Sequence, residues 1–367
     1  MDFSTSMELK EEDDALLVLA ANARAKVERA RCAFGTADWK ERKEVQGVHV
    51  FERKPAPGCF EVAASSILPC SAKEFLEVLS SRNSDDFNAT MVALAGDVFS
   101  YAVTLREVPT ASLNKHLSTK RMQLSGSIPL LSSSKTVEFL DYVEYDHKTR
   151  TAVRTFQTLS RDRAGRLVLG GDMMAGYVLG EQVASHQTSV FFFGTHNTSA
   201  DSTSKGLGRL KAAAVREVSA QGLLKLAKLI PKIGDIALRR RFGAEDTIDL
   251  AADCNYGEHT VGRCSGCGKT LKDSLLRKKH VCYICSEQTC SSCSKAQDVE
   301  GLIGVVERLR ICTCCMLSTR RRAFECHEIL DYCEPVETGP VLLLRPSTLS
   351  VLSTASTART TASSTRA

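Results

Sequence analysis

This chain of 367 residues has no long apolar run, and its sequence predicts no secretory leader. No run approaches the ~18–20 consecutive apolar residues that a membrane-spanning helix needs, so the sequence predicts no transmembrane segment. Residues 1–14 are acidic and lack the apolar core of a secretory signal, so we expect a cytoplasmic protein. Hydrophobic residues make up 43% of the chain and charged residues 25%, which is typical of a soluble globular protein, and the length allows two domains.

Catalytic signatures are also lacking. The eight histidines are scattered, and no Ser/His/Asp arrangement, HExxH motif or phosphate-binding glycine loop accompanies them. The Gly-Lys-Thr run at 268–270 directly follows Cys267 and has no glycine-rich segment upstream. We therefore predict that the protein is not an enzyme.

Aromatic residues are few, at 6%, and the only tryptophan is Trp39. Because no stacking pattern accompanies the basic residues, a nucleic-acid partner is not expected. The net charge of +5 is uneven, since residues 205–241 carry ten Lys/Arg against Glu217 and Asp235. Such an excess favours acidic partners such as anionic lipids, and a solvated helix face explains it equally well.

Cysteine is abundant, with 15 in the chain, and eight of these form four Cys-x-x-Cys pairs in the last third. Two thiolates on one tight turn can occupy two corners of a tetrahedron, so four pairs can complete two closed four-cysteine Zn²⁺ sites. In a reducing compartment, metal binding explains such pairs better than disulfides do. Closed sites leave no position for a reacting water, so the sequence predicts two structural Zn²⁺ ions. The expected ligands are Cys264, Cys267, Cys282, Cys285, Cys290, Cys293, Cys312 and Cys315.

Hydrophobic periodicity indicates mixed helices and strands in the first two thirds of the chain. Helix spacing predicts helices at 8–33, at 71–81 with a serine cap, and at 206–241 with a kink at Pro231. Short strand-like runs occupy 47–53, 59–64, 98–107, 137–145, 151–159 and 187–195. This order favours an α+β fold in which a curved antiparallel sheet grips a long carboxy-terminal helix.

Residues 18–242 resemble the START-like, helix-grip domains. The match is clearest for two strands followed by a helix, VQGVHVFERK and CFEVAASSILPCSAKEFLEVL. The resemblance implies an apolar cavity that holds a lipid or sterol. Ordinary core packing explains the apolar residues of the final helix equally well.

The spacing of the cysteine pairs resembles that of a FYVE zinc finger. The gaps between the pairs are 14, four and 18 residues, and all eight ligand positions are cysteines, whereas RING and PHD fingers use a histidine as an inner ligand. RKKHVCYICSEQTCSSCS at 277–294 is similar to the family's basic motif, and LRIC at 309–312 to the motif that opens its fourth pair. The resemblance implies a cross-brace, in which the first and third pairs hold one zinc and the second and fourth pairs hold the other.

The same resemblance implies a membrane-binding site for phosphatidylinositol 3-phosphate. Its headgroup contacts are Lys278, Lys279, His280 and Arg310, and its membrane-inserting residues are Leu275 and Leu276. The chain departs from the family pattern at Val281 and Tyr283, where basic side chains are usual, and it lacks the upstream Trp-x-x-Asp motif. A finger that binds a protein partner is therefore an alternative, and a RING-like ubiquitin ligase is another.

The sequence thus predicts a cytoplasmic, non-enzymatic zinc-binding adaptor that associates peripherally with endosomal membranes. Its partners would be anionic lipids, a lipid ligand of the START-like domain, and proteins. The expected organisation is an amino-terminal segment at 1–17, the START-like domain at 18–242, a linker at 243–257, the finger at 258–317, a short helix at 318–334 and a disordered Ser/Thr-rich tail at 335–367.

Overall fold

A computed structural model describes most of the chain up to Glu325. The described residues are 3–35, 38–42, 44–80, 83–96, 99–112, 114–124, 135–161, 167–168, 173–197, 221–244, 262–271 and 279–325. The expected tail, most of the expected linker, and Leu275, Leu276 and Lys278 lie outside these residues. None of the described helices has the length and apolarity needed to cross a bilayer.

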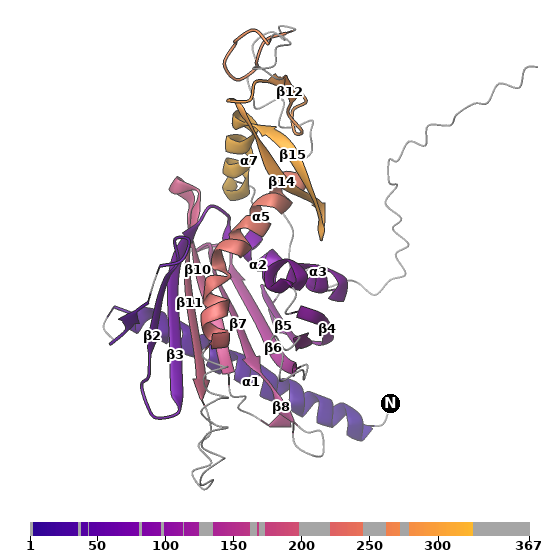
Figure 1. Cartoon of the computed structure of the whole chain (residues 1–367). Coiled ribbons are helices and arrows are strands. Elements are labelled where there is room, and N and C mark those ends of the chain that lie inside the picture. The colour runs from indigo at the N-terminus through magenta and orange to yellow at the C-terminus, as the bar shows by residue number, and fades with distance from the viewer. Residues whose placement is uncertain are drawn as a thin grey trace, which may run out of the picture. The chain divides into compact units, whose positions relative to one another are not determined.

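A nine-stranded sheet forms the centre of the larger part of the structure (Figure 1). Every neighbouring pair of strands is antiparallel. The strands follow the order β1 (Lys40–Glu41), β2 (His49–Arg53), β3 (Cys59–Leu68), β11 (Gln187–Asn197), β10 (Met173–Gln182), β7 (Thr151–Thr158), β6 (Lys135–Asp146), β5 (Lys115–Leu124) and β4 (Phe99–Val108). Outside this sheet, β8 (Ser160–Arg161) pairs with β9 (Leu167–Val168).

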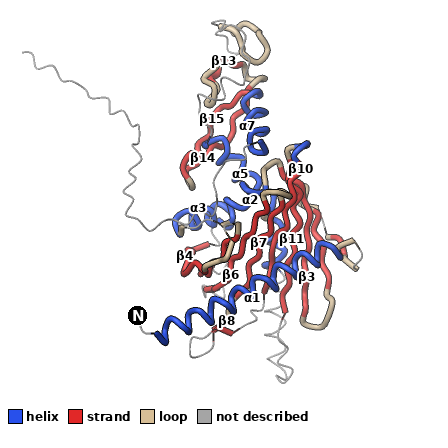
Figure 2. Tube along the Cα trace, turned by 180° about the vertical axis from the view of Figure 1, so that it is seen from behind, coloured by secondary structure: helices blue, strands red, loops and turns tan. Residues whose placement is uncertain are grey.

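Both faces of the sheet are covered, and β11 shows how the sequence separates them. Phe191 and Phe193 pack on the side of α1 (Phe3–Ala33), whereas Val190 and Phe192 belong to the core on the opposite side. This alternation follows from the two-residue repeat of a strand. Figure 2 shows α1 lying across its face of the sheet.

Helix α1 is longer than predicted. The expected helix at 8–33 is confirmed, and the observed helix begins at Phe3 and continues across the expected boundary after residue 17. Leu16, Ala20, Ala23 and Val27 are buried at intervals of three and four residues, which places them on one helix face.

The opposite face of the sheet carries α2 (Ala72–Leu79), α3 (Ser84–Ala95) and α5 (Ile230–Ala244). Ser71 and Glu74 form a capping box at the start of α2, with Ser71 N donating to Glu74 Oε2 at 2.8 Å and Glu74 N to Ser71 Oγ at 3.2 Å. This confirms the helix predicted at 71–81. The sheet with α5 packed against it has the helix-grip arrangement that the sequence predicted (Figure 1).

Pro231 does not kink a continuous helix as expected. Residues 221–228 are helical, a turn follows, and α5 begins at Ile230. Pro231 therefore occupies the first turn of α5, where its missing N–H has no intrahelical partner to lose. The rest of the helix predicted at 206–241 lies outside the described residues.

The cysteine-rich part contains two small antiparallel ribbons and a helix. The strands β12 (His280–Val281) and β13 (Gln288–Thr289) form one ribbon, and β14 (Ser294–Leu302) and β15 (Val305–Cys312) form the other. Helix α7 (Thr313–Glu325) follows β15 directly, so it begins inside the fourth cysteine pair rather than at residue 318.

Candidate metal centres and their surroundings

The first group of four cysteines consists of Cys264, Cys267, Cys290 and Cys293. The first two lie on a turn between the bridged residues Arg263 and Thr270, and the other two lie between β13 and β14. All four Sγ atoms lie within 4.8 Å of one another. The Sγ atoms of Cys267 and Cys290 are 3.8 Å apart.

The second group consists of Cys282, Cys285, Cys312 and Cys315, and all four are buried. Cys282 and Cys285 follow β12, Cys312 ends β15, and Cys315 lies in the first turn of α7. The Sγ atoms of Cys285 and Cys312 are 4.0 Å apart. The structure therefore gathers the eight cysteines into the same two sets that the cross-brace implied.

The sulfur spacing fits tetrahedral metal binding. Zinc–sulfur bonds of about 2.3 Å place neighbouring tetrahedral sulfurs about 3.8 Å apart, whereas a disulfide needs about 2.05 Å. Backbone N–H groups of Cys290, Cys312 and Cys315 donate to the Sγ atoms of Cys264, Cys282 and Cys312, each at 3.3 Å. Such donors stabilise thiolates, the form in which cysteine binds a metal. Each group can therefore hold one metal ion.

Two thiols have lowered pKa values. The Ser292 hydroxyl lies 3.0 Å from Cys290 Sγ and lowers the pKa of that thiol to about 6. Hydrogen bonds from Cys285, then Cys312 and Cys315, lower the pKa of Cys282. Both shifts favour the thiolate, whereas burial raises the pKa of Cys293 to about 12 and the hydrogen bond with Cys282 raises the pKa of Cys315, so the thiols within each group differ in how readily they ionise.

Two of the cysteine turns close in the same way. Gly268 N donates to Cys264 O at 2.8 Å, and Ser286 N donates to Cys282 O at 2.9 Å. Both residues following the pair are left-handed, with φ of 68° at Gly268 and 59° at Ser286. Glycine suits this conformation and serine does so less well, so the second turn is the more strained.

The expected headgroup residues are only partly brought together. His280 lies in β12, and its Nε2 is 3.0 Å from Ser291 Oγ, while Lys279 just before it is exposed. Arg310 lies in β15 beside this segment, because its carbonyl accepts a hydrogen bond from Tyr283 N at 2.7 Å. Arg310 Nη1 is buried and has no hydrogen-bond partner among the described residues. An anionic group would supply the missing partner.

Val281 and Tyr283 change the character of this surface. Val281 is 59% exposed and Tyr283 39% exposed. They present an aliphatic and an aromatic side chain where the resemblance leads one to expect basic groups. The surface therefore combines positive charge with exposed apolar area.

Buried apolar side chains pack between the sheet and α5 in the described part of the chain. Among the largest fully buried ones on this side are Phe75, Tyr177, Leu179, Phe192, Leu223, Ile230 and Ile233. Ordinary core packing, the alternative raised from the sequence, thus describes the apolar face of α5.

A charged cluster that the sequence analysis missed lies on the same side of the sheet. Asp141 accepts hydrogen bonds from Lys120 Nζ at 2.8 Å and from Arg154 Nε at 2.9 Å. Two cations thus share one buried carboxylate. The hydroxyls of Ser118 and Thr104, which pair in register with Asp141 and Lys120, are buried without hydrogen-bond partners among the described residues. The sequence feature that could have indicated this cluster is a charged residue, Asp141, inside the strand-like run at 137–145.

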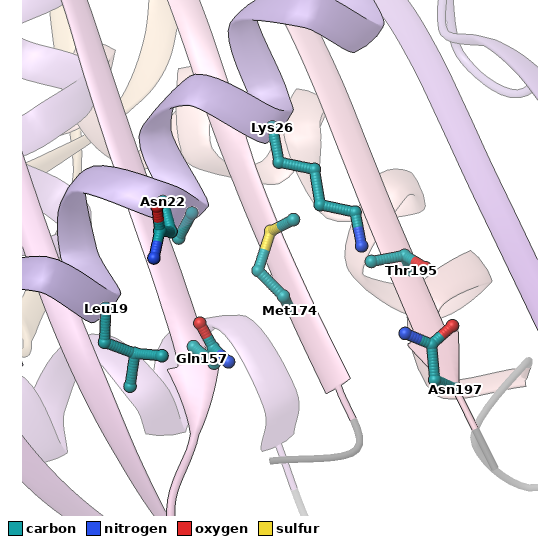
Figure 3. Close-up of a pocket in the computed structure, with 8 residues that line it drawn as sticks. Leu19, Asn22, Lys26, Gln157, Met174, Thr195 and Asn197 are labelled. Atoms are coloured by element: carbon teal, nitrogen blue, oxygen red, sulfur yellow. The ribbon is translucent and has the colours of Figure 1, made fainter. Parts of the chain in front are cut away.

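A small recess lies between α1 and strands β7, β10 and β11 (Figure 3). Its volume is about 160 Å³, below the ~300–1,000 Å³ of typical small-molecule pockets. One cation, Lys26, reaches into it beside Met174 and Thr195. The recess is too small to enclose a lipid.

No protein-family model and no curated protein matches the chain. Solved structures with a similar fold include human STARD10, with 9% identity over 56% of this chain and 78% of that chain and a TM-score of 0.36. Human StAR-related lipid transfer protein 5 is similar with 14% identity over 60% of this chain and 98% of that chain and a TM-score of 0.38. The lipid transfer and protein localization domain of human StarD13 is similar with 14% identity, over 57% of this chain and 95% of that chain, and a TM-score of 0.33.

Proposed function

We propose that the protein is a non-enzymatic zinc-binding adaptor that attaches peripherally to anionic membranes through a FYVE-type finger. The eight cysteines would hold two structural Zn²⁺ ions and thereby fix β12 and β15 beside each other. Lys279 and Arg310 would contact lipid phosphates, together with Lys278, which directly precedes Lys279 in the sequence. The endosomal surface, rich in phosphatidylinositol 3-phosphate, is the proposed location.

The observation that carries this proposal is the buried guanidinium nitrogen Nη1 of Arg310, which has no hydrogen-bond partner within the described ranges. A buried donor without a partner is costly unless a ligand completes its hydrogen bonding. Residues 262–325 also carry 12 Lys/Arg and six Asp/Glu, an excess of six positive charges. This excess attracts the finger to anionic bilayers.

The proposed lipid preference depends on which basic side chains of the finger are available to bind a lipid phosphate. The His280 ring is hydrogen-bonded to Ser291, and the side chains of Val281 and Tyr283 carry no positive charge. We therefore propose broad binding to anionic lipids, with 3-phosphate recognition limited to what Lys279, Arg310 and neighbouring basic residues provide. Tyr283 suits the membrane interface, where aromatic side chains with a polar tip are favoured.

Flotation of the full zinc-loaded chain with liposomes tests this proposal. The liposomes contain phosphatidylcholine alone, or with phosphatidylserine, phosphatidylinositol 3-phosphate or another phosphoinositide. Arg310→Gln should weaken binding to anionic liposomes about fivefold, because one basic group near such a surface contributes about 1 kcal/mol. Arg308→Gln is the matched control on the same strand, since Arg308 is exposed and already paired with Asp298 at 2.8 Å.

Two results of the flotation experiment would contradict parts of this proposal. Equal losses for the two variants would contradict the role of Arg310. Absence of flotation with every composition would overturn the membrane proposal and favour recognition of a protein partner.

A second proposed function is lipid binding by the helix-grip domain, and the charged cluster at Asp141 favours it. Lys120 and Arg154 exceed Asp141 by one positive charge, and the adjoining hydroxyls of Ser118 and Thr104 lack hydrogen-bond partners in the part of the chain that the structure describes. A lipid with a polar or anionic head would satisfy these groups, after the side chains between the sheet and α5 move apart. Native mass spectrometry of the full chain after incubation with fatty acids and phospholipids tests this, and Ser118→Val should reduce the bound fraction. No adduct with any lipid would contradict it.

A further inference from the structure

Helix α5 belongs to two hydrophobic cores at once. Ile230, Ile233 and Ile236 pack with the sheet in the helix-grip core. Farther along the same helix, Leu238 is half-buried and Phe242 is buried in the core of the finger, which also contains Ile284, Ile311 and all four cysteines of the second group. No cysteine of the first group belongs to that core in the described part of the chain.

Three consecutive arginines of α5 connect the two parts, and Arg240 contacts both, because its Nη2 donates to Thr90 Oγ1 of α3 at 2.8 Å. Arg239 and Arg240 both pair with Glu300 of β14, whose side chain is fully buried, with Arg240 Nε at 3.1 Å. Arg241 turns the other way and pairs with Glu74 of α2 at 2.5 Å, and it also donates to the carbonyl of Pro69 at 3.2 Å. Glu300 further accepts a hydrogen bond from Gly304 N at 2.9 Å, which fixes the turn between β14 and β15.

The backbones also meet closely at this junction. A Cβ atom added to Gly243 would lie 2.3 Å from the carbonyl oxygen of Glu300, so no other residue fits there. On the far side, Arg150 Nη1 donates to the carbonyl of Phe324 in α7 at 2.7 Å, and the Phe324 ring packs on His186 with centroids 5.6 Å apart. Contacts of this kind hold two elements in one arrangement.

We propose that α5 makes the second cysteine group and the helix-grip domain one cooperative unit. A metal ion at Cys282, Cys285, Cys312 and Cys315 orders the core that receives Leu238 and Phe242, and this secures the second half of α5. Because coupling between two sites is reciprocal, weakening the packing of α5 must also weaken metal binding by the second cysteine group. The first cysteine group stands outside this coupling.

One consequence rests on the proposed function. If the finger binds a membrane and the helix-grip domain binds a lipid, binding at the finger is transmitted to the helix that covers the sheet. The two parts would then act together rather than as separate modules on a tether.

The first test measures zinc transfer from the full zinc-loaded chain to a chromogenic chelator. Phe242→Ala, located 40 residues before the first cysteine of the second group, should release one of the two ions about tenfold faster and leave the other unchanged. Val92→Ala is the matched control, because Val92 is 56% exposed on α3 and lies outside both cores. Unchanged release of both ions in Phe242→Ala would overturn the proposal, as would equal acceleration by Val92→Ala.

The second test follows hydrogen exchange of α5 and needs no change in either core. Glu300→Gln should speed exchange of the amides at 238–244 about tenfold, because it leaves Arg239 and Arg240 with weakened partners. Asp298→Asn, two residues earlier on the same strand, removes only an exposed pair with Arg308 and should change exchange less than twofold. Chelation of zinc from the wild-type chain should reproduce the effect of Glu300→Gln.

The outcomes separate this proposal from the membrane proposal. Unaltered exchange at 238–244 in both Glu300→Gln and the metal-free chain would overturn the coupling, whatever the flotation shows. Failure of flotation alone would leave the coupling intact, because neither readout involves a lipid.

Discussion

Lys120 Nζ lies 2.8 Å from Asp141 Oδ2, and neither side chain is exposed to solvent. Arg154 reaches the other carboxylate oxygen from β7, so one acid compensates two cations inside the helix-grip domain. Burial alone would raise the pKa of Asp141, and the charges of Arg154 and Lys120 outweigh it and lower this pKa to about 2. The carboxylate is therefore required in its ionised form.

Asp141→Asn should lower the free energy of unfolding by about 3–5 kcal/mol, because it leaves Lys120 and Arg154 buried without a counter-charge. Denaturant unfolding at neutral pH measures this. Glu138→Gln is the matched control, since Glu138 lies on the same strand and pairs with the exposed Arg121, and its loss should be below about 1 kcal/mol. Equal losses would contradict the requirement for the buried charge.

The pH dependence of this contribution follows from the sign of the shift. The folded-state pKa is depressed, so the stabilisation is present above about pH 4 and is lost as the pH falls through about 2. The Asp141→Asn protein should lack this acid transition.

Periodicity predicted the strands with regular alternation but not the rest of the sheet. β10 was missed because Gly176 and Gly180 interrupt its pattern, and the structure gives a reason for the first of these. A Cβ atom at Gly176 would lie 2.6 Å from the carbonyl oxygen of Arg154. β5 was missed because it is rich in charged and polar residues, and one of them, Lys120, is buried against Asp141.

The two cysteine groups could be predicted because ligand spacing is local and the cross-brace belongs to a known pattern. The junction at Glu300 could not, since Arg239 and Arg240 lie 61 and 60 residues away in sequence and their partner is set by packing. The same holds for Asp141, whose partners come from two neighbouring strands. Long-range polar contacts leave no periodic signal in a single sequence.

Metal content should be two Zn²⁺ per chain, measured by elemental analysis of the purified protein. Cys285→Ser should remove one ion, because a closed tetrahedral site loses most of its affinity with one sulfur. Cys314→Ser is the matched control, since Cys314 is exposed and belongs to neither group. Loss of an ion in the control, or retention of both in Cys285→Ser, would contradict the assigned ligands.

Ser286→Gly should raise the free energy of unfolding of the zinc-loaded chain by about 0.5–1 kcal/mol. Ser286 has a φ of 59°, a conformation that glycine adopts at little cost and other residues at about 1 kcal/mol or more. Thermal unfolding measures the change. Ser286→Ala retains the strain and removes only the hydroxyl, so a similar gain in that variant would show that the backbone conformation is not the cause.

Glu77→Gln should abolish a loss of stability that the wild-type chain shows between about pH 4.5 and pH 7. Glu77 lies on α2, and burial, followed by the charge of Glu74, raises the pKa of its carboxyl group to about 7. A raised pKa means that the protonated form fits the fold, so this contribution is full below about pH 4.5 and is lost as the pH rises through about 7. Glutamine stays neutral and should make the chain more stable above pH 7, by on the order of 2 kcal/mol. Denaturant unfolding across pH 4–8 measures this, with Glu307→Gln at an exposed position as the control. A wild-type stability that rises over this range, or equal curves for Glu77→Gln and wild type, would show that Glu77 is ionised at no cost.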